Sequence, residues 1–100
     1  MTGTVSSFLD FPIRVIDSAG QTMPFETTVE LSLDGADSID LIGESTFTVG
    51  STNSTTAGQF NFVIEIESTA VAGEQAIATL KVTTPSGIVS TDSHIVRVIP

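Results

Sequence analysis

The segment Phe60-Asn61-Phe62-Val63-Ile64-Glu65-Ile66-Glu67 indicates the fold class most directly, because its apolar residues recur at every second position. The residues that share the apolar face are Phe60, Phe62, Ile64 and Ile66. A period of two predicts a β-strand with one buried face, since successive side chains of a strand point to opposite sides. The segment 25–33 shows the same alternation from Val29 onward and predicts a second half-buried strand.

The rest of the chain reads as short strands separated by turns. Further strands are predicted at 11–17, 38–42, 45–49 and 76–84, and 88–99 reads as one last strand or a bent pair. Turn-forming residues recur about every ten residues, at 17–20, 34–35, 50–58, 72–74 and 85–87. This spacing predicts one all-β domain over residues 1–100, a sandwich of two antiparallel sheets with seven or eight strands.

Composition excludes several classes of partner. The 100 residues carry 3 basic and 12 acidic side chains, a net charge of −9, so nucleic acid and anionic lipid surfaces are unfavourable partners. Trp and Tyr are absent, which removes the usual platforms for stacking bases or sugars. The sequence contains no run of eighteen apolar residues, so no membrane-spanning segment is predicted. Cysteine is also absent, which excludes disulfides and favours a prokaryotic or viral source.

Three segments resemble a known family. The segment 11–31, with Asp17, Gly20 and Pro24 at its turn, resembles the opening hairpin of bacterial and archaeal immunoglobulin-like surface domains of the invasin and intimin type. Segments 58–62 and 72–82 are similar to the second half of those domains. The resemblance implies an immunoglobulin-like sandwich that serves as a repeated spacer or adhesive module.

An acidic loop follows the predicted strand 25–33. Asp34, Asp37 and Asp40 recur at every third position, with Glu44 four residues further on. Loop carboxylates are the ligands that Ca²⁺ prefers, so these three aspartates are the candidate metal ligands. The alternative is that they form turns, cap strands and face solvent. No other cofactor is expected.

Asp92, Ser93 and His94 are the residues that most resemble a hydrolytic constellation. Asp92 and His94 are expected to share a strand face, which would place them in contact, whereas Ser93 faces the other side. No Gly-x-Ser-x-Gly nucleophile motif is present and no second histidine. We therefore expect no catalytic residues and no enzyme activity.

Two residues are candidates for covalent modification. Asn53 begins the sequon Asn53-Ser54-Thr55 in a Ser/Thr-rich loop and is a glycosylation candidate. Lys81, the only lysine, is a candidate for an isopeptide bond to Asn61 with Glu65 or Glu30 as the assisting acid. A plain cross-strand charge pair is the alternative for Lys81.

The sequence therefore predicts a non-catalytic structural or adhesive module of a prokaryotic or viral protein, located extracellularly, on the cell surface or on the virion. Its expected partners are proteins or neighbouring modules, including further copies of itself. The apolar runs 5–11 and 95–99 at the chain ends read as strands whose edges either pair within the chain or pair with a second copy, as in self-assembly. A calcium-dependent or receptor-binding module that uses loop 34–44 is the alternative.

Overall fold

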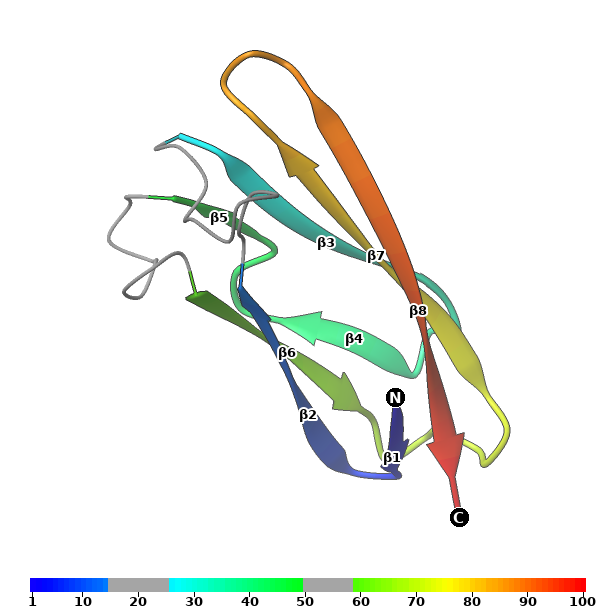
Figure 1. Cartoon of the computed structure of the whole chain (residues 1–100). Coiled ribbons are helices and arrows are strands. Elements are labelled where there is room, and N and C mark those ends of the chain that lie inside the picture. The colour runs from blue at the N-terminus through cyan, green and yellow to red at the C-terminus, as the bar shows by residue number, and fades with distance from the viewer. Residues whose placement is uncertain (15–25, 50–58) are drawn as a thin grey trace.

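The computed structural model describes residues 1–14, 26–49 and 59–100, and these contain eight strands and no helix (Figure 1). The strands are β1 (Thr2–Thr4), β2 (Ser7–Arg14), β3 (Thr28–Gly35), β4 (Ile39–Ile42), β5 (Thr46–Thr48), β6 (Gln59–Ile66), β7 (Gln75–Thr83) and β8 (Val89–Ile99). The all-β prediction is confirmed. In the same three ranges, no helix is long and apolar enough to cross a membrane.

The strands form two sheets. Sheet A has five strands in the order β1-β8-β7-β3-β5, and sheet B has three in the order β2-β6-β4. The predicted alternation of β6 is confirmed, because Phe60, Phe62, Ile64 and Ile66 are all buried. They belong to one hydrophobic core that also contains Val29 and Leu31 of β3, together with inward residues of β7 and β8. One core between two sheets gives a sandwich-like arrangement.

Aromatic contacts join the two sheets at one end of the core. The ring of Phe47 on β5 stacks on the ring of Phe60 on β6, with centroids 5.1 Å apart and an interplanar angle of 15°. The same ring meets Phe62 edge-on at 5.0 Å and 62°. Such pairs add to the stabilisation that burial of the rings provides.

The first strand pairs with the last strand in a parallel sense. Thr2, Gly3 and Thr4 lie opposite Arg97, Val98 and Ile99. The other strand pairs are antiparallel, so the prediction of two antiparallel sheets is wrong for this one pair. The alternation of apolar residues does not predict β1, because its inward position is a glycine rather than an apolar side chain. Gly3 is buried against Leu9 and Ile66, and a Cβ there would lie 2.6 Å from Ile66 Cδ1.

The predicted opening hairpin is also wrong. Strand β2 pairs with β6 in sheet B, whereas β3 pairs with β5 and β7 in sheet A. Strand β2 ends at Arg14, and residues 15–25 of the segment that connects it to β3 lie outside the described residues. The two strands thus carry the chain from one sheet to the other.

The chain crosses between the sheets again at Gly35. Its φ of 142° and its closeness to β7 favour glycine, since a Cβ would lie 2.6 Å from the carbonyl oxygen of Gln75. The backbone N–H of Ala36 donates to that carbonyl at 3.1 Å. This crossing places Asp34 at the end of sheet A and Asp40 in sheet B.

The hairpin formed by β7 and β8 reaches beyond the other described strands (Figure 1). Residues 89–95 of β8 are exposed on both faces, and burial begins only at Val96. The segment 88–99 is a single long strand here, which decides between the two predicted alternatives. The molecule is elongated, with extents of 41 × 22 × 19 Å.

Candidate functional site

Strand β8 presents a free edge over its first half. One side of Val89–Ile99 pairs with β7 from Val89 to Arg97. On the other side β1 pairs only with the last three residues, Arg97 to Ile99. No other strand of residues 1–14, 26–49 or 59–100 lies beside residues 89–95 on that side. An edge of this kind presents unpaired backbone N–H and C=O groups to a partner chain.

The backbone groups of the odd-numbered residues point to this free edge. Arg97 N–H donates to the carbonyl of Met1 at 3.0 Å, and the Met1 amino group donates to the carbonyl of Ile95 at 3.1 Å. Because both backbone groups of a residue in an antiparallel ladder point the same way, Ser93 and Thr91 present theirs on the same side. Ser93 N–H is engaged by the Asp92 carboxylate at 3.0 Å.

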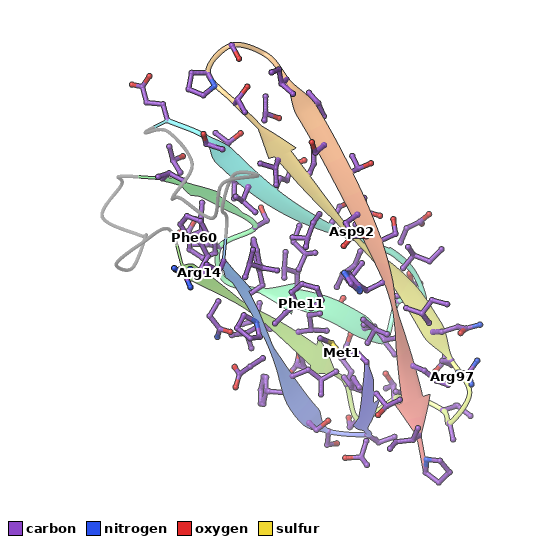
Figure 2. The ribbon with its side chains drawn as sticks, in the orientation of Figure 1. Met1, Phe11, Arg14, Phe60, Asp92 and Arg97 are labelled. Atoms are coloured by element: carbon purple, nitrogen blue, oxygen red, sulfur yellow. The ribbon has the colours of Figure 1, made fainter. Side chains whose placement is uncertain are left out.

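Asp92 and His94 form a polar pair on the inner face of β8. The predicted contact is confirmed: His94 Nε2 lies 3.0 Å from Asp92 Oδ2. The imidazole also meets the ring of Phe11 edge-on, with centroids 5.6 Å apart. Figure 2 shows Phe11 projecting from β2 toward β8, where Asp92 is labelled. His94 is therefore positioned from two sides although its side chain is 47% exposed.

These residues do not assemble a hydrolytic triad. Ser93 faces the outer side of sheet A, where its hydroxyl lies 3.4 Å from the hydroxyl of Thr79. The hollow beside His94 is shallow and is lined by Met1, Phe11, Pro12 and Ile13. A hydroxyl nucleophile needs its base within hydrogen-bond reach, whereas the partner of the Ser93 hydroxyl is the hydroxyl of Thr79.

The three candidate calcium ligands are spread over two sheets and the turn between them. Asp34 is exposed on β3, Asp37 is exposed in the following turn, and Asp40 is half-buried on β4. In the described ranges, no group of three His, Cys, Asp or Glu side chains is arranged to hold a metal ion. The residue that Asp40 does meet is Glu67, which follows β6.

Asp40 and Glu67 are a carboxyl pair that sequence reasoning missed. A side-chain hydrogen bond with Asp40, and the negative charge of that carboxylate, raise the pKa of Glu67 above its ordinary value. Glu65 and Asp37 contribute in the same direction. The pairing of β4 with β6, which sets Asp40 opposite Glu65, brings these acids together, and no local pattern in the sequence reports that pairing.

Lys81 and Asn61 lie on different sheets. Lys81 is exposed on β7 of sheet A, where Glu30 of β3 is its cross-strand neighbour. Asn61 belongs to β6 of sheet B and donates to Asp10 Oδ1 at 3.2 Å. Because Asn61 and Lys81 face outward from opposite sheets, the predicted isopeptide bond between them is wrong. The cross-strand arrangement of Lys81 and Glu30 fits the alternative charge pair.

The glycosylation candidate Asn53 lies outside the described residues.

No family model, no curated protein and no solved structure matches this chain. Its function is therefore inferred from the geometry of the described residues.

Proposed function

We propose that this chain is a non-catalytic, immunoglobulin-like structural module that transmits tension between its two ends as a stiff spacer or assembly unit. The observation that carries the proposal is the parallel pairing of β1 with β8, the first and the last strands of the chain.

Hydrogen bonds connect the two terminal strands directly. Met1 donates to Ile95 at 3.1 Å and accepts from Arg97 at 3.0 Å, and three further register pairs follow down to Thr4 and Ile99. Beneath them, Gly3 packs against Leu9 and Ile66, and Val98 is fully buried. The strand that enters the module is therefore fixed to the strand that leaves it.

The parallel direction decides how this contact responds to force. Met1 and Pro100 lie at opposite ends of the paired segment, as the chain ends in Figure 1 show. Tension applied through the two ends loads the inter-strand hydrogen bonds together, in shear. In an antiparallel hairpin pulled at its open end, the bonds break one after another. A parallel terminal pair thus favours mechanical resistance without any added cross-link.

Strand order supports the immunoglobulin-like assignment. An immunoglobulin sandwich has one sheet with the order B-E-D and a facing sheet with the order G-F-C. Sheet B, with the order β2-β6-β4, matches B-E-D when these strands are equated in turn with B, E and D. The centre of sheet A, with the order β8-β7-β3, matches G-F-C in the same way. Strand β5, beside β3, is an addition to that pattern.

The exterior fits an extracellular, cell-surface or virion-surface location. The net charge of −9 opposes nonspecific aggregation, and the absence of cysteine makes the fold independent of redox conditions. The proposed partners are proteins or neighbouring modules attached at the chain ends.

Single-molecule pulling in two directions tests the proposal. The sequence contains no cysteine, so introduced cysteines give unique attachment points. One variant carries an added cysteine at each end of the chain and loads β1 against β8. The control variant carries Gln75→Cys and a C-terminal cysteine, and it peels β8 from β7, because Gln75 lies opposite Arg97.

We expect a clearly higher unfolding force through the chain ends than through the control pair. Equal forces in the two directions, or a lower force through the chain ends, would contradict the proposal. Thermal melts of both variants must match that of the original chain, so that a difference in force reflects direction rather than stability.

A further inference from the structure

The turn between β1 and β2 contains a residue in a strained backbone conformation. The two residues 5–6 connect Thr4 of β1 to Ser7 of β2. Ser6 has a φ of 60°, in the left-handed region that glycine adopts readily and residues with a Cβ adopt at a cost. The hydroxyl of Ser7 donates to the carbonyl oxygen of Thr4 across this turn. The chain therefore reverses over two residues, one of which is strained.

The strand before this turn can separate from the core. Gly3 is the only buried residue of β1, and Thr2 and Thr4 are exposed. The hydrophobic core cluster contains no residue of β1. Met1, which precedes β1, lies in the hollow beside Phe11 and is 44% exposed (Figure 2). Strand β1 can therefore leave β8 while the two sheets stay packed against each other.

We propose that two copies of this chain exchange β1, so that β1 of each copy pairs with β8 of the other copy. The β8 edge itself shows which strand fits it, because β1 already occupies residues 97–99 within one chain. In the exchanged dimer the same register is kept, and Gly3 packs against Leu9 and Ile66 of the other copy. The contacts of β1 are the same in both forms, and only the turn 5–6 changes, from reversed to extended.

The strain at Ser6 favours this exchange. An extended backbone at residues 5–6 removes the left-handed φ from both copies, so each dimer relieves two strained residues. Short connections under strain are the ones that favour domain swapping. Because the closed and exchanged forms share the contacts of β1, the conformation of this turn has a large effect on the equilibrium between them.

The length of the turn fixes how the two copies meet. The segment from Thr4 to Ser7 spans at most about 10 Å when extended, so the two turns must lie close to each other across a two-fold axis. Figure 1 shows this turn at one end of the described strands, where a second copy can approach along the long axis. The exchanged dimer is therefore two modules joined end to end.

Charge opposes the dimer at low ionic strength. Ser7 lies opposite Ile66, so Glu67 is beside the turn. Two turns that meet at a two-fold axis bring the two Glu67 side chains near each other, and each copy carries a net charge of −9. Salt screens this repulsion. We therefore expect the dimer to be stronger in molar sodium chloride than in low salt.

Exchange of β1 goes beyond the spacer role, because it joins two chains through a contact that the spacer makes within one. The pulling experiment uses single chains, in which β1 pairs with its own β8. The mechanical proposal and the exchange proposal can therefore fail separately.

Two substitutions at Ser6 test the effect of the turn. Ser6→Pro fixes φ near −65° and excludes the closed turn, whereas Ser6→Gly adopts the closed turn without strain. Sedimentation velocity up to millimolar protein, in low salt and in molar sodium chloride, gives the dissociation constant of the dimer. Circular-dichroism melts show whether each variant is folded.

A disulfide shows whether the dimer exchanges β1. Thr2→Cys with Arg97→Cys places two thiols on neighbouring strands of a chain that has no other cysteine. After oxidation of the isolated dimer, exchange links the two chains covalently, and a denaturing gel without reductant reports the link. The control is Gln75→Cys with Arg97→Cys, which lie opposite each other on β7 and β8 and close within one chain in either form.

We expect a concentration-dependent dimer for the original chain that strengthens with salt, and a tighter dimer for Ser6→Pro. The dissociation constant of Ser6→Gly should exceed that of the original chain by at least about tenfold. An original chain that is monomeric at millimolar concentration in molar salt would overturn the proposal. So would equal dissociation constants for Ser6→Gly and the original chain. A dimer whose introduced Thr2→Cys and Arg97→Cys thiols close within each chain would place the association on another face and would also contradict exchange.

Discussion

Thr2 on β1 lies directly beside Arg97 on β8, and the two strands run in the same direction. This contact joins the second residue of the chain to a residue near its other end. The neighbouring Gly3 lets β1 lie close to the core, because the space that a side chain would need is taken by Leu9 and Ile66. The proposed mechanical role depends on this close approach.

Gly3→Val is expected to dislodge β1 and to lower the free energy of unfolding by about 1–3 kcal/mol, the usual cost of overpacking. The new Cβ would lie 2.6 Å from Ile66 Cδ1 and 2.9 Å from Leu9 Cδ2, so both side chains must move. Urea unfolding measures the change. Thr2→Val, on the exposed side of the same strand, is the control and should change stability little. A stable Gly3→Val protein would show that β1 is not closely packed.

Phe62→Ala is expected to destabilise the protein by about 3–5 kcal/mol, because it leaves a cavity where Phe47 meets β6. Phe8→Ala removes the same ring from a position that is 64% exposed and should cost at most about 0.5 kcal/mol. Chemical denaturation of both variants gives the comparison. Similar losses for the two would contradict the assignment of inner and outer faces.

Thr27→Val is expected to stabilise the protein by about 1 kcal/mol. The Thr27 side chain is fully buried, and its hydroxyl has no hydrogen-bond partner in the described part of the chain. A methyl group of similar shape removes the desolvation cost of that hydroxyl. Thermal unfolding monitors the gain, and Thr28→Val at the half-exposed next position is the control. A loss of stability in Thr27→Val would indicate that the hydroxyl is satisfied.

Glu67→Gln is expected to raise the melting temperature at pH 7 but not near pH 3.5. The native pKa of Glu67 is raised by Asp40, so the native state holds this proton more tightly than the unfolded state. The stability that this proton contributes is present at low pH and is lost as pH rises through the raised pKa. Melts across this range test the sign. Glu44→Gln, which removes the same charge at an exposed site, is the control; an equal gain in melting temperature there would exclude a specific pair of Glu67 with Asp40.

The strands with one buried face could be predicted from the sequence. In β6 and β3, burial alternates with the same period as the apolar residues, so the local pattern of each strand predicts which of its faces is buried. The Asp92–His94 contact followed from the same reasoning, because residues two apart share a strand face. Predictions of this kind need no knowledge of which strands are neighbours.

Strand partners could not be predicted in this way. Strand β1 is Thr-Gly-Thr and carries no apolar alternation, because its inward contact is made by a glycine backbone. The aspartates 34, 37 and 40 looked like one cluster, but the crossing at Gly35 leaves Asp34 in sheet A, Asp37 in the turn and Asp40 in sheet B. Asp40 instead meets Glu67, which is distant in sequence and near only because β4 pairs with β6.

The mechanical role is tested most sharply by the unfolding force measured through the two chain ends for the original chain, Gly3→Val and Thr2→Val. We expect Gly3→Val to unfold at a clearly lower force, because β1 no longer engages β8 in shear, while Thr2→Val keeps the original force. If Gly3→Val loses equilibrium stability and yet unfolds at the original force, the resistance arises elsewhere. The role proposed for the β1–β8 pair would then be wrong.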